Sequence, residues 1–458
     1  MLSQRKRGVT PPCLFYRMIY QKAYLCGHFT STHVSDLTKQ ILKCGWVKSK
    51  DIISETEREV YYYSFQEFMF SKSMTHGCYS FNKTLSDEFV VGDTHVFLRK
   101  LQLFILPLNV VLFSINIEIS SENVKNICSL MRRLRNCRNY GSLHKKWKEK
   151  VVAPLKEVCQ FLTGNKNASY IDLVENSDRL KIMRIVWSDG GFEKLETSDR
   201  HKLLYNLCTD DWKTDADGLS VDENSEYIES MYSKHSLHIF KDWEVLSLSN
   251  SFTVLYKNKI DSDEIANIAH PKMYDYWDAK FRVLYIYALF QKCYLFKLNN
   301  SHLEIIKKNN SRQISNKSFF NFLSIKNDTS ALTSLTKEYS SFENRYVFRN
   351  LSYNTFTSTL YSSMYDGLEI EKERQEISRV IKSEKQEEDA ANSKKLNIVL
   401  LLLSLFTMFS AILAAGQLLD NIIPFDSWLP NTNIGYLLVT ILVIVTFYFF
   451  AKRFSNEN

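Results

Sequence analysis

Residues 396–415 read LNIVLLLLSLFTMFSAILAA, a stretch without a charged side chain. Because an α-helix rises about 1.5 Å per residue, a helix over these residues covers about 30 Å, the thickness of the hydrocarbon core of a bilayer. Residues 434–451 form a second uncharged stretch, which is rich in Ile, Leu, Val and Phe and about as long as the shortest spanning helix. The sequence therefore predicts two transmembrane helices.

The charges that flank these two stretches predict how they cross the membrane. Lys394 and Lys395 precede the first stretch, and Lys452 and Arg453 follow the second, whereas the connecting residues 416–433 contain neither Lys nor Arg. Cytoplasmic segments carry an excess of Lys and Arg. We therefore expect a multi-pass protein of the plasma (inner) membrane, with both termini in the cytoplasm and a short outer loop.

The composition limits what the rest of the chain can be. A chain of 458 residues exceeds what one hydrophobic core usually organises. Its formal charge of +7 is modest for that length and does not by itself predict binding to nucleic acid, so no direct nucleic-acid partner is expected. The nine cysteines include no CxxC pair, which favours reduced thiols over a disulfide framework.

Alternating and helical patterns predict an α/β region before the membrane segments. Closer to the membrane segments, helices are expected to replace the strands, with an Asn-, Ser- and Lys-rich hairpin tip between two of them. The predicted strands are residues 100–106, 110–119, 244–248 and 252–256; the predicted helices are 123–138, 147–162, 202–208, 274–296 and 328–364, and the hairpin tip is 299–316.

Residues 368–395 predict one long helix that runs straight into the first membrane stretch. They contain neither Pro nor Gly and carry many charges at i, i+4 spacing. Their apolar positions are few, mainly Ile370, Ile377 and Ile381, which predicts a solvated stalk rather than a core element. The acidic cluster from Glu384 to Asp389 is either a solvated face or a ring that attracts cations.

The predicted fold class is therefore an α+β or α/β cytoplasmic domain followed by a long helical stalk and two C-terminal transmembrane helices. The expected domain organisation is a cytoplasmic α/β domain at 1–270, a helical hairpin and stalk helix at 271–395, transmembrane helices at 396–415 and 434–451, an outer loop at 416–433 and a cytoplasmic tail at 452–458.

Small and weakly polar residues gather on one side of the first membrane helix when its positions are plotted at about 100° per residue. Two interpretations are open. Small residues let membrane helices pack closely, and hydroxyl groups can bond back to their own backbone. Alternatively, symmetric copies of the helix turn this stripe inward to line a pore. The candidate pore-lining residues are Asn397, Ser404, Thr407, Ala411 and Gly416.

The helix predicted from residue 123 carries the densest basic patch of the chain. Arg132, Arg133 and Arg135 are candidate ligand-binding residues, because guanidinium groups pair bidentately with phosphate oxygens. A solvated helix face, or one held near anionic lipid headgroups, is the alternative. Asp210 and Asp211 follow a short predicted helix and are either further ligand- or metal-binding groups or a helix cap.

Sequence motifs of common enzymes are absent from the chain. It contains no P-loop, no GxGxxG after a strand, no HExxH and no GxSxG. His235 and His238 are three residues apart, yet no Cys or carboxylate pattern near them supports a zinc site. We therefore expect a protein that is not an enzyme and has no certain cofactor.

This layout resembles the CorA-type magnesium and cobalt transporter family. That family combines a cytoplasmic α/β domain, a helical hairpin, a long helix that continues into the first of two C-terminal spans, and a short outer loop. The resemblance implies a homo-oligomer, usually a pentamer, in the lipid bilayer, with a divalent cation such as Mg²⁺ as its possible ion. In the family a Gly-Met-Asn motif closes the first span; here residues 415–418 read Ala-Gly-Gln-Leu, so that only Gly416 matches.

Divergent members that lack the motif occur as membrane effectors of type III CRISPR antiviral defence, and this sequence resembles that subgroup. The resemblance implies a channel gated by a nucleotide second messenger bound in the cytoplasmic domain. Two alternatives remain. One is a constitutive Mg²⁺ transporter, and the other is a non-conducting membrane anchor whose cytoplasmic domain binds partners.

Overall fold

The structure is a computed structural model that describes residues 18–30, 37–49, 58–70, 77–81, 87–136, 144–163, 180–210, 225–238, 241–248, 250–258, 277–315, 328–348 and 350–422. The chain divides into two compact units, Met1–Ile381 and Lys382–Asn458. The predicted second membrane helix, residues 423–433 of the outer loop that precedes it and the C-terminal tail lie outside the described residues.

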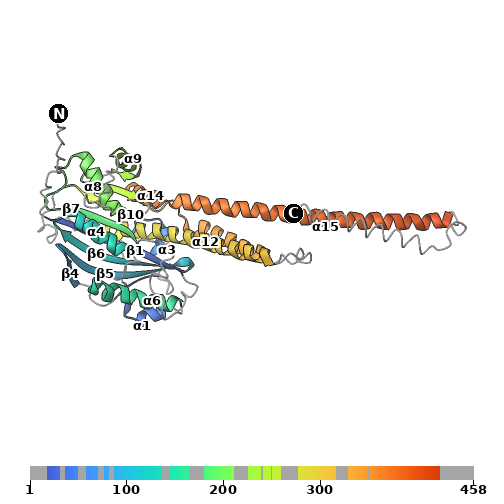
Figure 1. Ribbon diagram of the computed structural model, residues 1–458, viewed down its shortest axis with the longest axis horizontal. Helices are drawn as coiled ribbons and strands as arrows, with labels where there is room; N and C mark the ends of the chain where they lie inside the picture. The colour runs from blue at the N-terminus through green and yellow to red at the C-terminus, as the bar shows by residue number, and fades with distance from the viewer. Residues whose placement is uncertain are drawn as a thin grey trace, which may run out of the picture. The chain divides into compact units, whose positions relative to one another are not determined.

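A mixed ten-stranded sheet forms the centre of the first unit (Figure 1). Its order is β2-β3-β5-β6-β1-β7-β10-β9-β8, with β4 paired to β5. All described pairs are antiparallel except β7 with β10. The strands are β1 (Ile19–Thr30), β2 (Trp46–Lys48), β3 (Gly77–Phe81), β4 (Asp87–Val91), β5 (Thr94–Leu106), β6 (Val110–Ser121), β7 (Lys181–Ser188), β8 (Ser236–Leu237), β9 (Trp243–Leu248) and β10 (Ser251–Tyr256).

The four strands predicted from sequence are confirmed within β5, β6, β9 and β10. The 3₁₀ turn η1 (Pro107–Asn109) joins β5 to β6. Leu108 and Asn109 take positive φ angles of 59° and 61° there, so that this short turn reverses the chain between two long strands.

Side chains of the central strands alternate between two hydrophobic cores, one on each face of the sheet. In β1, Ala23 and Leu25 belong to one core, and Tyr24 and Cys26 belong to the other. This follows from the two-residue period of a strand. The first unit is thus a three-layer arrangement in which helices cover both faces of the sheet.

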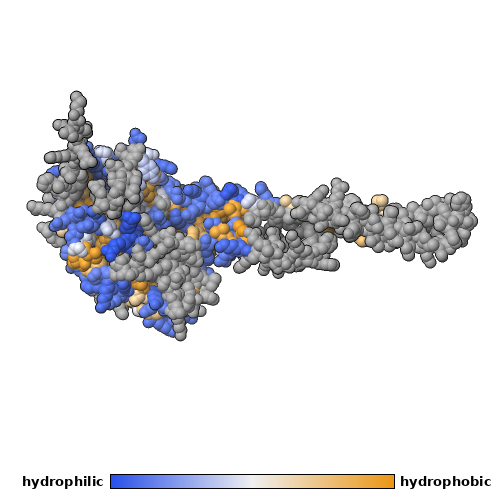
Figure 2. All heavy atoms as spheres, in the orientation of Figure 1, coloured by the Kyte–Doolittle hydropathy of each residue, from blue (hydrophilic) through white to orange (hydrophobic). Residues whose placement is uncertain are grey.

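Helices α1 (Leu37–Lys43), α4 (Val124–Arg135), α6 (Ala153–Thr163), α8 (Thr197–Thr209) and α9 (Ser225–His235) contribute to the first core. The short α5 (Lys145–Trp147) and η3 (Lys148–Val152) lead into α6. The second core receives α3 (Tyr63–Phe70), η5 (Trp277–Phe281), α12 (Arg282–Ser315), α13 (Asp328–Tyr346), α14 (Thr355–Gly367) and the beginning of α15 (Ile370–Ile422). On the face in Figure 2, hydrophilic residues cover much of the described surface, and an apolar patch lies over the helices around α12.

The helices predicted at residues 274–296 and 328–364 have different bounds in the structure. Residues 299–315 are not a hairpin tip, because α12 continues through Ser315. These residues contain no Pro or Gly, and Asn and Ser cost a helix only a few tenths of a kcal/mol each. The predicted helix 328–364 is instead two helices, since the Asn354 side chain accepts hydrogen bonds from Phe356 N and Thr357 N and begins α14.

The prediction of a solvated stalk is wrong for its first turns. Ile370 and Ile377 are 1% and 6% exposed and belong to the second core, and Ile381 packs against it. Three apolar residues suffice because the helix lies on a surface that α12, α13 and α14 have already made apolar. The prediction that the stalk and residues 396–415 form one helix is confirmed, since α15 extends from Ile370 to Ile422.

Gly27 allows close packing in the middle of β1. A Cβ atom at this position would lie 2.3 Å from Cζ of Phe113 in the neighbouring strand β6. We expect Gly27→Ala to destabilise the protein by about 1–3 kcal/mol, the usual cost of overpacking a core. Denaturant unfolding of the full chain measures this. If the clash is the cause, Phe113→Leu in the same chain should recover part of the loss, whereas strictly additive losses would contradict it.

Candidate functional site

Arg132 and Arg133 lie on the exposed side of α4, near its C-terminal end. The helix begins at an Asn123 cap, whose side chain accepts from Lys125 N, and its apolar side chains Val124, Ile127, Met131 and Leu134 are buried. Cations near a helix C-terminus are favoured by the helix dipole. These two residues therefore lie on the surface, as the predicted basic patch requires.

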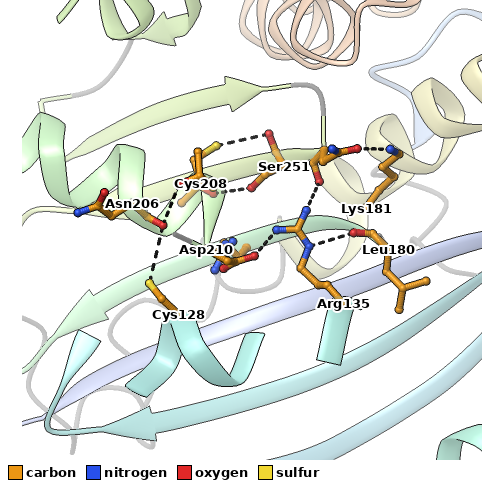
Figure 3. Close-up of polar contacts among 12 residues, drawn as sticks. Cys128, Arg135, Leu180, Lys181, Asn206, Cys208, Asp210 and Ser251 are labelled. Atoms are coloured by element: carbon orange, nitrogen blue, oxygen red, sulfur yellow. Dashed lines mark hydrogen bonds and ion pairs between the residues drawn. The ribbon is translucent and has the colours of Figure 1, made fainter. Parts of the chain in front are cut away.

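Arg135 does not belong to that surface. It is 1% exposed, and its Nε and Nη2 donate to the carbonyl oxygens of Leu180 and Asn250, both at 3.0 Å. Its Nη1 donates to a carboxylate oxygen of Asp210 (Figure 3). The helical period explains this correction, because Arg135 is one turn after the buried Met131 and so points toward the sheet.

Asp210 ends α8 and is likewise an interior residue. Its φ of 54° places it in the left-handed conformation that Asp tolerates better than most residues. Besides the hydrogen bond from Arg135, its Oδ1 lies 2.6 Å from Nη2 of Arg184 in β7, which is 0% exposed. Asp210 is thus a counter-ion for two buried arginines and not an open ligand site. Asp211 lies outside the described residues.

Sequence reasoning missed Arg184, although the chain held a signal for it. Arg184 stands within KIMRIVWS, where all close neighbours on the strand are apolar. A charge at such a position is buried with the strand and needs a partner, because an unpaired buried ion is costly. The partner itself comes from a turn after another helix, which no local pattern discloses.

A cavity of about 230 Å³ lies beside this ion cluster, between the sheet and the second helical layer. Strands β1, β6 and β7 supply one side of it, and α12 and α15 supply the other. Asn250 connects the two sites, since its carbonyl accepts from Arg135 and its side-chain oxygen accepts from Nζ of Lys181. The lining residues are Cys26, Gly27, His28, Leu112, Lys181, Leu289, Lys292, Cys293, Phe296 and Glu373.

Two lysines and one glutamate give the cavity its charge. Lys292 of α12 places Nζ 3.3 Å from Oε1 of Glu373 and donates to the Leu368 carbonyl at 2.6 Å. Burial raises the pKa of Glu373, against the opposing effect of Lys292. Burial, and then repulsion by Lys292, lower the pKa of Lys181 to about 8. The amine of Lys181 is therefore easier to deprotonate than a surface lysine.

His28 and two cysteines supply the neutral polar groups of the cavity. Burial and the charge of Lys181 lower the pKa of His28 to about 4, so its imidazole is neutral at pH 7. Its Nε2 is buried without a hydrogen-bond partner. Burial raises the pKa of Cys26 and Cys293 to about 12, so both thiols stay protonated. None of these residues was singled out by the sequence.

The stripe on α15 is solvent-exposed over its described residues. Asn397, Ser404, Thr407 and Ala411 are all exposed, and the surroundings of Gly416 lie outside the described part. Ser404 Oγ donates to the Leu401 carbonyl at 2.7 Å, and Thr407 Oγ1 donates to the Ser404 carbonyl at 2.8 Å. Both hydroxyls thus bond back to their own helix, as the packing interpretation expects.

The described residues contain neither an apolar spanning helix nor a cluster of metal ligands. Within that part of the chain, no helix combines the length and the apolarity of a membrane span. Nor do three or more His, Cys, Asp or Glu side chains gather there in a way that could hold a metal ion.

Comparison with models of known protein families found no match, and comparison with curated proteins found none.

The Arg135–Asp210–Arg184 cluster makes a prediction for stability. Asp210→Asn keeps the size and the left-handed backbone but leaves two buried arginines without their anion, which should cost about 3–5 kcal/mol. Arg99→Gln is the control, because Arg99 and Glu118 form a surface pair at 2.6 Å and such pairs contribute at most about 1 kcal/mol. Equal losses in the two variants, measured by denaturant unfolding, would contradict the assigned role of Asp210.

Proposed function

We propose that this protein is an oligomeric membrane channel of CorA-like layout, gated by an anionic nucleotide that binds its cytoplasmic α/β domain. In this proposal it acts as a membrane effector of the type III CRISPR kind, in which ligand binding permits ion leakage. The observation that carries the proposal is the continuity of α15. This helix begins within the core at Ile370 and continues without interruption through the uncharged residues 396–415.

A continuous helix is a suitable mechanical link. Its backbone hydrogen bonds are internal, so a rotation or shift of its first turn is carried along its axis rather than absorbed in a loop. Residues 370–415 contain neither Pro nor Gly, the usual sites of a kink. Any ligand that moves the first turn of α15 therefore also acts on the residues proposed to cross the membrane.

A series of contacts leads from the basic end of α4 to the cavity that the first turn of α15 lines. Arg132 and Arg133 provide guanidinium groups at the surface, suited to phosphate oxygens. The next arginine on this helix, Arg135, contacts Asn250, which also contacts Lys181 in the cavity. Glu373 of α15 lines the same cavity. Neighbouring residues of this kind support coupling between the surface arginines of α4 and the first turn of α15, and ion-flux measurements test that coupling.

The energy required is within reach of a charged ligand. A nearly complete switch between two states needs the ligand to bind one state better by roughly 5.5 kcal/mol. Hydrogen bonds to charged groups contribute about 1.5–3 kcal/mol each. Two arginine–phosphate pairs that form in only one state would therefore suffice.

Ion flux through liposomes that contain the purified full chain tests the proposal. We expect flux with candidate nucleotide messengers and little with Mg²⁺ alone. Arg132→Ala/Arg133→Ala should reduce the nucleotide response at least tenfold, because each arginine contributes charge-assisted hydrogen bonds to phosphate. Lys39→Ala/Lys43→Ala on α1 is the matched control, since it also removes two exposed positive charges. Mg²⁺ flux that ignores nucleotides would instead favour the constitutive transporter.

The stripe on α15 separates a pore from a membrane anchor. Ser404→Leu/Thr407→Leu adds bulk to the side proposed to face the pore, so conduction per channel should fall severalfold. At about 100° per residue Phe406 lies on the opposite side, and Phe406→Trp is the control for added bulk. Single-channel recording in planar bilayers measures both variants. Unchanged conductance in the double variant would contradict pore lining and favour helix packing.

A further inference from the structure

The cavity next to Lys181 has more positive than negative charge in its lining. Lys181 and Lys292 are two cations, and Glu373, which lies near Lys292, is the one carboxylate among the lining residues that the structure describes. Among the described residues, no carboxylate lies within ion-pair distance of Lys181, whose Nζ instead bonds the neutral side chain of Asn250. One further negative charge in the cavity would balance the second lysine.

One polar group in the cavity wall can donate a hydrogen bond to an anion. His28 Nε2 is buried without a hydrogen-bond partner. Buried polar groups are seldom left without a partner, because such a group has lost the hydrogen bonds that it makes with water. His28 is 8% exposed and neutral, so it can donate a hydrogen bond to an oxygen atom in the cavity.

The remaining wall is apolar, and the size of the cavity limits what enters. Leu112, Leu289 and Phe296 provide hydrocarbon and ring surface between the polar groups. A volume of about 230 Å³ equals roughly seven to eight water molecules at their liquid volume. Sites for drug-sized molecules are commonly about 300–1,000 Å³. The cavity is therefore suited to a small molecule and not to the nucleotide of the proposed function.

We propose that this cavity binds a small carboxylic acid with an apolar body. Its carboxylate lies between Lys181 and Lys292 and accepts a hydrogen bond from His28, and its apolar part contacts Leu289 and Phe296. The ligand carboxylate takes the place of Glu373 as the anionic partner of Lys292. The cavity is thus a second ligand site, separate from the exposed arginines of α4.

Displacing Glu373 has a consequence for α15. Lys292 holds the start of this helix by two contacts, one to Glu373 and one to the Leu368 carbonyl just before it. A ligand that takes over Lys292 removes the first contact and so weakens the attachment of the first turn of α15. This regulatory step rests on the proposed function, whereas binding of the acid does not.

Calorimetric titration of the full-length protein with hexanoate tests the binding step. Hexanoate should bind, whereas hexan-1-ol and hexylammonium, which have the same apolar body without the negative charge, should not. Lys181→Gln should weaken binding about tenfold, the value of one hydrogen bond to a charged group. Glu373→Gln should strengthen binding severalfold, because it removes the carboxylate that competes for Lys292.

Two controls keep the test independent of folding. Lys372→Gln changes the residue next to Glu373, whose side chain is 80% exposed, and should leave binding unchanged. Thermal unfolding identifies a variant that fails to fold. A stable Lys181→Gln variant with unchanged affinity, or weaker binding in Glu373→Gln, would overturn the proposal.

Proton uptake gives a second signature. The groups that face Lys181 are Lys292 and Cys293 of α12, Arg135 of α4 and Glu373 of α15, with His28 of β1 beside them. An added anion raises the pKa of Lys181 from about 8, so binding at pH 8 should take up part of a proton. Titrations in two buffers of different ionisation enthalpy measure it, and no uptake would contradict contact with Lys181.

Flux assays with hexanoate separate the two proposals. Binding that leaves nucleotide-dependent flux unchanged would exclude regulation through Glu373 and keep the binding site. Nucleotide-dependent flux in a protein that does not bind hexanoate would overturn the cavity proposal and keep the channel. Altered flux together with the opposite effects of Lys181→Gln and Glu373→Gln would support both.

Discussion

The ion cluster of Arg135, Asp210 and Arg184 is the interaction on which the rest of this structure depends. A buried guanidinium group must have an anion, and one aspartate serves two of them here. It thereby fixes the end of α4, the end of α8 and the strand β7 relative to one another. Arg135 also orders Asn250, which positions Lys181 at the cavity. The cluster therefore also helps to position one of the charged side chains of the cavity.

Part of the fold could be predicted from the sequence, because two simple periods govern it, but of the ten strands of the described sheet only β5, β6, β9 and β10 were predicted. Strand alternation located β6, and the helical stripe of α4 located the side that packs on the sheet. The helical period also places Arg135 on that inner side. The prediction nevertheless assigned Arg135 to the basic patch, because its side chain is charged. The ends of helices were harder. Residues 299–315 have the composition of a loop. They are nevertheless helical, because they continue α12, which packs on the second core.

Little of the cavity could be predicted in this way. The charged residues of the cavity are Lys181, Lys292 and Glu373. They come from three elements that are far apart in the sequence, so only the fold brings them together. Local patterns report which side of an element is buried but not what it meets there. The contrast with Arg132 and Arg133 is instructive, because an exposed basic patch on one helix can be predicted from a single stretch of sequence.

The parallel pairing of β7 with β10 bears on the order in which parts of this domain form. Antiparallel neighbours such as β5 and β6 need only a short turn, whereas a parallel pair needs a long crossover, here residues 189–250. Long loops close late, because their entropy is lost before any contact is gained. Asp210 and Asn250 both lie on this crossover. The β5–β6 hairpin can thus form early, while the buried ion cluster forms later, because it joins Arg135 to Asp210, 75 positions further along the chain.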